Sequence, residues 1–441
     1  MTTHSLIRVI VLTAVSVLLS ISLTGCMGLG SKAASMQIEL AAGRVDNAFV
    51  IAEKENADED EVLASLNKGM LRRMKGDYQG SNRIFEIAKK LIEELYGVSV
   101  SEQAGSMIVN DTLRSYSGDR YEQLLLHAYM AMNYIQLDDF DSARVEMLQA
   151  NVKMQEWGED PEDDPFVRYL SGMIYEALGE KDQAVVSYRQ AKDVYKATIK
   201  KQNTGIPTVL KKDLLTSLAN QGFYDELRVL KKEFKMNTFK PEAISKGFGE
   251  LIVVLNSGLA PIRKEVAIAA VSNDVTGTVK IAVPRYSEPK SFYSARLTTE
   301  HKVSADLELV ENIDALARAA LSNDMPVITA RAITRAVVKH KTQKFAEERG
   351  GTWGGFLATV ANIASEQADT RSWITLPQTI QMARVKLPAG VNKVNIEIYN
   401  ASGTMVDTIN KEVIVKSRQS TFLTEHWVAP NMALNVVADK K

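Results

Sequence analysis

Cys26 carries the most reactive side chain in the sequence and is the only cysteine among the 441 residues. It ends the string Leu23-Thr24-Gly25-Cys26, which follows a mostly apolar run that begins at Val9. A charged front end at Arg8, a short apolar core and small residues before a cleavage point are the parts of a secretory signal. The run is too short to span a bilayer comfortably. The sequence therefore predicts that residues 1–25 are removed by cleavage between Gly25 and Cys26.

The same string resembles the bacterial lipobox. The resemblance implies that Cys26 becomes the first mature residue and carries a thioether-linked diacylglycerol and an amide-linked acyl chain such as palmitate. Each buried methylene contributes about 0.8 kcal/mol, so three chains hold a protein on a membrane permanently. Met27 stands where an Asp would favour the inner membrane. The resemblance thus implies the periplasmic face of the outer membrane, with residues 26–34 as a tether. The alternative is an ordinary signal peptide or a membrane anchor that happens to end in cysteine.

The rest of the sequence contains no motif typical of metal binding or of a known catalytic site. The histidines, at positions 4, 127, 301, 340 and 426, have no pair at metal-ligand spacing. Gly247 and Gly249 precede an expected strand, the wrong order for a dinucleotide site. The 53 basic and 54 acidic residues balance, which gives no indication of a nucleic-acid surface. We therefore predict no catalytic residue, no metal and no cofactor. A carboxylate-based hydrolase stays open, because the distances between acidic side chains are not visible in a sequence.

Two polar segments have the composition of binding sites. The acidic cluster Glu159–Asp164 could bind a divalent cation, but it lacks the ligand spacing of a calcium loop and is better interpreted as a solvated loop. Asp369, Arg371 and Trp373 place a guanidinium between an acid and an indole, which predicts either a partner-recognition surface or a structural clamp. The clamp is favoured, because pairing of Asp with Arg beside a buried Trp commonly pins a loop onto a core.

The helices expected over residues 35–238 contain a repeat. The segment Pro165–Tyr195 has the small and aromatic residues of one tetratricopeptide unit, a helical hairpin of 34 residues. The same register recurs in two earlier segments, and the expected turn positions are 43, 76, 138, 179 and 222. An insertion is expected over Gly97–Asp119. The predicted repeat-packing residues are Gly69, Gly76, Ala88, Tyr134, Ala143, Gly172, Tyr175, Gly179, Ala184, Tyr188 and Ala191.

The tryptophan that is typical of the first helix of a tetratricopeptide unit is absent from these segments, and their register is irregular. An irregular α-solenoid is therefore the alternative to a true repeat array. Both interpretations predict stacked hairpins whose concave face binds a peptide or a protein.

Residues 241–441 change character: β-branched residues and turn signals increase, which predicts an α+β domain. The expected strands are Leu251–Leu255, Thr278–Val283, Phe292–Thr299, Lys302–Val310, Val394–Tyr399, a run from Met405, Glu412–Lys416 and Thr421–Val428. The expected helices are Ile313–Ser322, Pro326–Glu348 and Trp353–Gln367. The fold class is therefore multidomain: an N-terminal all-α TPR-like solenoid, followed by an α+β domain with a C-terminal antiparallel β sheet or sandwich.

Three stretches look like the signatures of an uncharacterised bacterial family of repeat-bearing outer-membrane lipoproteins. They are Leu255–Lys264, Arg331–Lys339 and Asp369–Pro377. Members of that family are often associated with lipoproteins that activate peptidoglycan-synthesising penicillin-binding proteins, so the resemblance implies a role in the cell envelope.

Together these patterns predict a non-enzymatic periplasmic scaffold that is anchored through Cys26 and binds a protein partner through its repeats. The process would be envelope assembly or the regulation of peptidoglycan synthesis, and no nucleic-acid partner is expected. Two alternatives remain: a carboxylate-dependent peptidoglycan-active hydrolase, and an accessory of a secretion or assembly complex.

Overall fold

The computed structural model describes residues 28–54, 57–102, 115–158, 164–202, 204–241, 243–271, 278–289, 291–338 and 367–430. The predicted signal peptide, Cys26, residues 159–163 of the acidic cluster and nearly all of the predicted helix Trp353–Gln367 lie outside these ranges. The five expected turn positions of the repeat, by contrast, lie within them.

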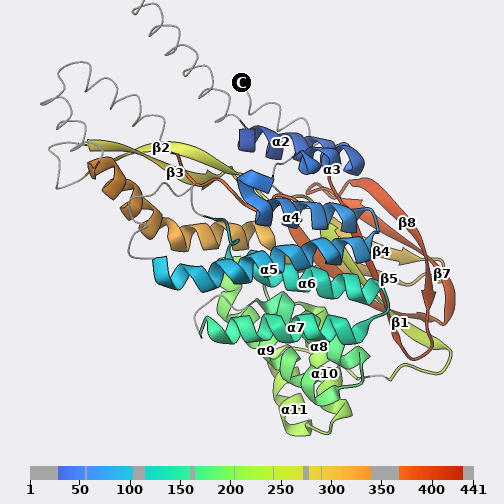
Figure 1. Cartoon of the computed structure of the whole chain (residues 1–441). Coiled ribbons are helices and arrows are strands. Elements are labelled where there is room, and N and C mark those ends of the chain that lie inside the picture. Colours follow the sequence, from blue (N-terminus) through green and yellow to red (C-terminus); the bar gives the residue numbers. More distant parts are fainter. Residues whose placement is uncertain are drawn as a thin grey trace, which may run out of the picture.

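The first half of the chain is a row of antiparallel helical hairpins (Figure 1). The first hairpin consists of α2 (Gly28–Ala41) and α3 (Val45–Glu53), and the second of α4 (Ala57–Met74) and α5 (Tyr78–Glu102). Three more follow: α6 (Arg120–Gln136) with α7 (Phe140–Glu156), α8 (Pro165–Ala177) with α9 (Lys181–Gln202), and α10 (Thr208–Asn220) with α11 (Tyr224–Glu233). The helix α2 occupies most of the segment predicted as a tether, and the expected insertion lies at the junction between α5 and α6.

The backbone at each expected turn position is left-handed. Gly43, Gly76, Gly179 and Gly222 have φ between 72° and 78°, and Asp138 has φ 60°. Glycine adopts this conformation without steric cost, and Asp tolerates it better than most residues do. The turn spacing in the sequence therefore located the hairpins, including the one that lacks glycine.

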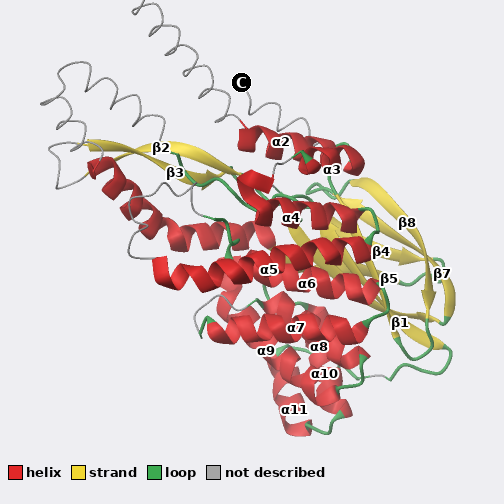
Figure 2. Cartoon of the chain, viewed as in Figure 1, coloured by secondary structure: helices red, strands yellow, loops and turns green. Residues whose placement is uncertain are grey.

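The second half forms one curled sheet and a separate hairpin (Figure 2). The strands are β1 (Phe248–Ser257), β2 (Arg263–Val271), β3 (Thr278–Tyr286), β4 (Ser294–Thr299), β5 (Ser304–Asn312), β6 (Thr379–Pro388), β7 (Gly390–Tyr399), β8 (Met405–Val415) and β9 (Ser420–Trp427). Seven strands pair in the order β8-β7-β4-β5-β6-β1-β9, and every pair is antiparallel except β1 with β9.

The curled sheet brings its two edge strands, β8 and β9, close together. No backbone ladder joins them in the described chain, but Trp427 Nε1 donates to Asp407 Oδ2 at 2.7 Å and Lys411 Nζ lies 2.8 Å from Glu425 Oε1. Lys416, which follows β8, pairs with Asp138 in the α6–α7 turn at 2.8 Å. Side chains and a helical turn thus cover edges that would otherwise be open to pairing with another chain.

The fold class is confirmed, with four differences from the expected elements. The run from Met405 and the expected strand Glu412–Lys416 form the single strand β8. The strands β2 and β6 were missed, and the sheet is mixed because β9 runs parallel to β1. Residues 313–338 form one helical run that continues through Pro326, where two helices were expected. Proline removes one helical hydrogen bond but does not have to end a helix.

The Gly172→Ala variant tests the repeat packing. A Cβ at position 172 would overlap the ring of Tyr188, which is fully buried. We expect a loss of about 1–3 kcal/mol in the free energy of unfolding, measured by urea denaturation. Gly205→Ala is the control, because its Cβ would meet only Ile199 at 3.9 Å and should leave the midpoint unchanged. An equal effect of the two variants would contradict close approach of α8 and α9 at Gly172.

Candidate interaction site

Most of the predicted repeat-packing residues lie between the helices, but Gly76 and Gly179 are exposed in the turns. Gly69 faces the ring of Phe85 as Gly172 faces Tyr188, and in each case an added Cβ would overlap the ring. The alanines at the close approaches have exposures of 0–1%. Those alanines are Ala88, Ala143, Ala184 and Ala191. Tyr175 is 5% exposed and Tyr134 is partly buried, so neither offers a free ring to a partner.

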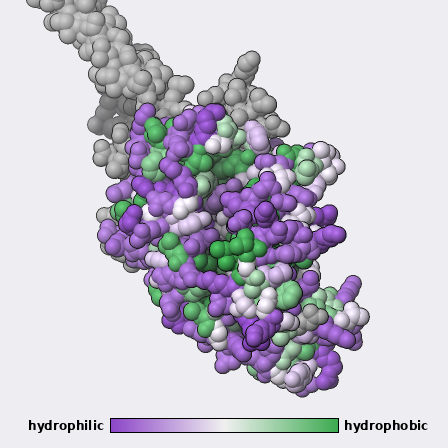
Figure 3. Space-filling view, turned by 90° about the vertical axis from the view of Figure 1, so that its right-hand side faces the viewer, coloured by the Kyte–Doolittle hydropathy of each residue, from purple (hydrophilic) through white to green (hydrophobic). Residues whose placement is uncertain are grey.

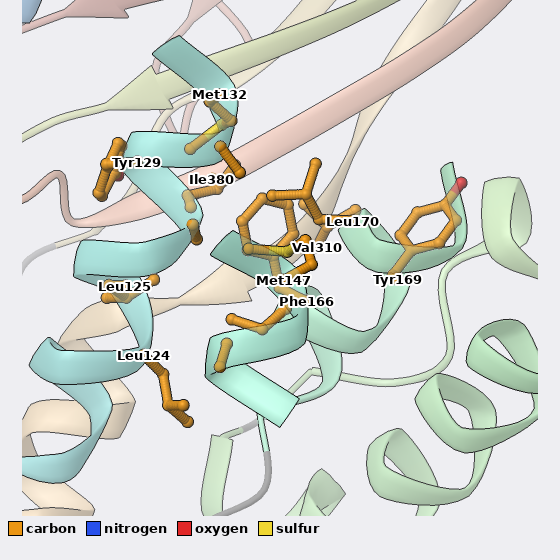
Figure 4. Close-up of a cluster of buried hydrophobic side chains, with 14 of the residues drawn as sticks. Leu124, Leu125, Tyr129, Met132, Met147, Phe166, Tyr169, Leu170, Val310 and Ile380 are labelled. Carbon is orange, nitrogen blue, oxygen red and sulfur yellow. The ribbon is translucent and has the colours of Figure 1, made fainter. Parts of the chain in front are cut away.

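The concave face of the solenoid is covered by the protein's own sheet. The inner helices α6, α8 and α10 contact β9, β5 and β6 respectively. In α6 every residue from Tyr121 to Asn133 is buried, so both sides of this helix are covered. Figure 4 shows side chains of α6 and α8 gathered with Val310 of β5 and Ile380 of β6 in one apolar cluster. The expectation that this face binds a peptide is therefore wrong for the folded chain.

A buried ion-pair cluster joins the repeats to the sheet. Arg384 of β6 contacts Glu176 of α8 at 2.7 Å, Asp213 of α10 at 2.8 Å and Glu250 of β1 at 2.5 Å. Burial opposes the charge of Arg384, but the three carboxylates raise its pKa well above the usual value. Burial raises the pKa of Asp213 to about 7, against the attraction of Arg384.

Two tyrosine hydroxyls complete this cluster. Tyr169 donates to Asp213 at 2.5 Å and Tyr188 donates to Glu176 at 2.8 Å. The fit of Tyr188 against Gly172 is thereby coupled to the contact with the sheet.

A second junction contains the segment singled out for its Asp, Arg and Trp. Arg371 makes a two-point contact with Asp369, at 2.9 and 2.7 Å, and pairs with Asp60 of α4 at 2.8 Å. Trp373 is 1% exposed and lies edge-on to Phe85 and Tyr129. Its backbone N–H donates to Glu122 at 2.8 Å. The geometry is that of the favoured alternative, a clamp between the two halves, because the indole presents no surface to a partner.

A third junction is a pair of carboxyl groups. Asp164 caps α8 by accepting from the Val167 N–H at 2.9 Å, and it is hydrogen-bonded to Glu311 of β5. Burial and the nearby Asp164 charge raise the pKa of Glu311 well above its ordinary value. Glu311 and Asp164 are 0% and 2% exposed, so this pair is closed to a substrate in the folded chain.

Acidic and histidine side chains of the described residues take part in packing and pairing within the protein. No group of three or more His, Cys, Asp or Glu side chains there has a metal-binding arrangement. No helix in the described ranges is both long and apolar enough to cross a bilayer. His127 instead contacts Glu146 at 2.8 Å within the repeats, and burial lowers the pKa of His127.

Apolar side chains are exposed on one of the outer helices in the part of the chain that the structure describes. On α7, Val145, Leu148 and Val152 share one face and have exposures of 45%, 47% and 51%. The face to the right in Figure 1 is mostly hydrophilic, with hydrophobic residues gathered near its middle (Figure 3). Among the exposed apolar side chains of the described repeats, these three recur at regular helical spacing and form a stripe on α7. We take this stripe as the candidate interaction site.

Sequence reasoning missed Arg384, Glu122 and the burial of the concave face. One signal was present: α6 reads Leu124-Leu125-Leu126 and then Ala128 to Met132, an apolar stretch interrupted only by His127. Such a stretch is wider than one face of a helix, which indicates burial on more than one side. The roles of Arg384 and Glu122 had no comparable signal, because each depends on contacts with elements distant in the sequence.

Comparison with known proteins finds neither a family profile nor a curated protein that matches the chain. Solved structures are matched in part. A structure of MamA from AMB-1 has 16% identity and a TM-score of 0.30, covering 47% of this chain and 88% of that one. BtubC from P. vanneervenii has 16% identity and a TM-score of 0.32, covering 46% and 74% respectively. A MamA RS-1 variant has 15% identity and a TM-score of 0.31, covering 48% and 95%. Because these scores are low, the functional argument rests on this chain's own residues.

Replacing Arg384 with Gln tests the junction. The change leaves three acidic groups without their cation, and we expect a loss of about 3–5 kcal/mol in the free energy of unfolding at pH 7. The pKa of Asp213 is above its unfolded value of 3.8, so folding takes up a proton as the pH falls from about 8 to 5. Without Arg384, which lowers it, the pKa of Asp213 should rise further, so the variant takes up more protons on folding than the unchanged protein does. The loss should therefore shrink on acidification, as measured by urea denaturation across that range.

Arg296→Gln is the matched control for that measurement. It breaks a pair with Asp306 whose partners are 51% and 71% exposed, and the midpoint should not move. A pH-independent loss in Arg384→Gln would contradict the assigned role of the carboxylates.

Proposed function

We propose that the protein is a lipid-anchored, non-enzymatic scaffold of the bacterial envelope, held at the periplasmic face of the outer membrane through Cys26. It presents the outer surface of its helical hairpins to a protein partner in envelope assembly or peptidoglycan synthesis. The scaffold proposal rests on the covering of the concave face. The sheet occupies the surface on which a solenoid would enclose a ligand, and an exposed apolar stripe remains on α7.

The burial of the acidic clusters supports a non-enzymatic role. The carboxyl groups whose pKa values are raised most are those of Asp119, Asp213 and Glu311. The side chain of Asp119 is 16% exposed, and the residues Asp213 and Glu311 are 8% and 0% exposed. A hydrolase acting on a polymer needs two carboxyl groups that reach the scissile bond. Asp213 and Asp119 instead pair with Arg384 and Arg263, and Glu311 is bonded to Asp164.

The start of the fold supports a short anchor. Helix α2 begins at Gly28, and its Gln37 donates to the backbone oxygens of Ala260 and Ile374 at 3.0 and 3.2 Å. Met36 and Leu40 are buried beside these groups. A lipid on Cys26 would thus hold the folded body near the bilayer.

The anchor is tested by mass spectrometry of the native protein and by the Cys26→Ser variant. We expect an amino terminus at Cys26 that carries three acyl chains, and a variant that leaves the outer-membrane fraction. Retention by three chains is effectively permanent, whereas one chain is marginal. An unmodified thiol or an amino terminus at Met1 would disprove the anchor.

The partner surface is tested with Leu148→Glu and Val152→Glu combined in one variant. We expect periplasmic crosslinks of the lipidated protein to disappear, because two charges enter an apolar contact. The melting temperature should change little, since both side chains are about half exposed.

A variant with Val391→Glu and Ile414→Glu adds two charges at exposed apolar positions of β7 and β8, away from α7, and serves as the matched control. It should keep the crosslinks. Crosslinks that persist unchanged in the double variant would exclude α7 as the partner surface.

A further inference from the structure

The hairpin of β2 and β3 lies outside the seven-stranded sheet. Figure 1 shows it reaching away from that sheet, alongside the helical run of residues 313–338. Val279, Ile281 and Val283 of β3 pack against Ala332 of this run. β3 is therefore the inner strand of the hairpin, and β2 forms its outer edge.

The exposures of paired residues show the same arrangement. Ile268 of β2 is 38% exposed, whereas its partner on β3, Ile281, is 1% exposed. The next pair repeats the difference, because Ala267 is exposed and its partner Ala282 is buried. Within the part of the chain that the structure describes, no third strand pairs with this hairpin. The outer edge of β2 is thus open along these residues.

The start of β2 is covered by another segment. Arg263 donates to the Arg371 carbonyl oxygen at 3.2 Å, and Glu265 accepts a hydrogen bond from the Ala368 N–H at 2.8 Å. The charged residues of β2 are confined to this covered start, Arg263–Glu265, and the rest of the strand is apolar. The open part of the edge therefore begins at Val266.

The open part of β2 is symmetric about Ile268. Residues 267–269 are exposed, and Val266 and Ala270 on either side of them are partly buried. All five side chains are apolar. An open apolar edge is a place where a strand of another chain can add to a sheet. Because the pattern is the same in both directions from Ile268, this stretch is complementary to an antiparallel copy of itself.

The edges of the large sheet differ from this one. Side chains of β8 contact Trp427 and Glu425 of β9, and Lys416 pairs with Asp138 in a helical turn. A hairpin of two strands is only marginally stable by itself, and a third strand or a packed helix supports it. The helical run supports β3, whereas β2 gains support only if a further strand is added.

We propose that β2 pairs antiparallel with β2 of a second copy of this chain, about a two-fold axis at Ile268. The two Ile268 side chains then lie opposite each other, and Val266 of each copy lies opposite Ala270 of the other. Opposed apolar side chains stabilise a strand pair, and like charges are not placed opposite each other. This pairing requires neither the lipid anchor nor the stripe on α7.

A pair formed in this way is closed. Both copies use the same strand, so the interface is isologous and the combined sheet has the order β3-β2-β2-β3. Its outer strands are the two β3 strands, in which residues 281–284 are buried. The arrangement therefore ends at a dimer and does not extend into a filament.

The register is tested with the full mature protein by mixing Ala267→Cys with Ala269→Cys and oxidising the mixture. In the proposed pair, position 267 of one copy lies directly opposite position 269 of the other, at a separation that a disulfide bridges. Each position lies diagonally from its own counterpart, about 7–8 Å away, which is too far for a disulfide. We expect a covalent dimer from the mixture and several-fold less from either variant alone.

The unchanged protein is the control for this experiment, because its thiol is expected to carry lipid. A covalent dimer of the unchanged protein would show that Cys26 is free, which would contradict the anchor and not the pairing of β2. The two variants would then be compared in a Cys26→Ser background. Equal dimer from Ala267→Cys alone and from the mixture would overturn the proposed register.

A second measurement is the mass of the protein by sedimentation in density-matched detergent. We expect twice the chain mass for the unchanged protein and one chain mass for Ile268→Lys, because two lysines would then lie opposite each other. The melting temperature should change little, since Ile268 is partly exposed. Val391→Lys, at a residue of β7 that is 56% exposed, is the matched control and should remain a dimer. A single chain mass for the unchanged protein, which pairing of β2 with a different protein would also give, would overturn the proposal.

Discussion

Burial of the inner helices against the sheet is the contact on which the rest of the structure depends. One apolar cluster runs from Val62 and Phe85 in the repeats to Ile252 and Ile380 in the sheet. A solenoid hairpin normally contacts only its neighbours. Here α6, α8 and α10 also contact strands of the second half, so the sheet as well as the neighbouring hairpins holds these helices in place. Repeats and sheet are two architectures that share a core.

Polar groups at this junction specify how the two halves meet. Three buried sets do so: Arg384 with its three carboxylates, Asp164 with Glu311, and Arg371 with Asp60. Buried ion pairs add little net stability, because desolvation offsets the attraction, but breaking one is costly. An incorrect docking of sheet on solenoid would leave several buried charges unpaired. The apolar cluster therefore drives association, and these groups discriminate against other registers.

The parts of the fold that could be predicted are those encoded locally. Turn positions such as Gly76 and Gly179 require a left-handed backbone, and alternation along Val394–Tyr399 shows a strand with one buried face, so each left a pattern in the sequence. Strand β6 was missed because its alternation changes phase at Ala383: the apolar residues are Ile380 and Met382 before it, and Val385 and Leu387 after it. The sealed concave face follows from pairings such as Val310 with the repeats. The apolar stretch of α6 indicates that this helix is covered, but no local pattern shows which strands cover it.

The distinction between local sequence patterns and contacts of distant segments also separates the stripe on α7 from the buried arginines. The stripe on α7 has regular helical spacing and stayed exposed when the opposite side of the solenoid was covered. Arg73 of α4 belongs to the interior, yet it differs from every junction arginine in one respect: Arg263, Arg371 and Arg384 each have a carboxylate partner from a distant segment, and Arg73 has only an amide within the described chain. Arg168 of α8 is likewise held by the amide oxygens of Asn151 and Gln190, so an amide oxygen is a second means by which the repeats orient a buried guanidinium.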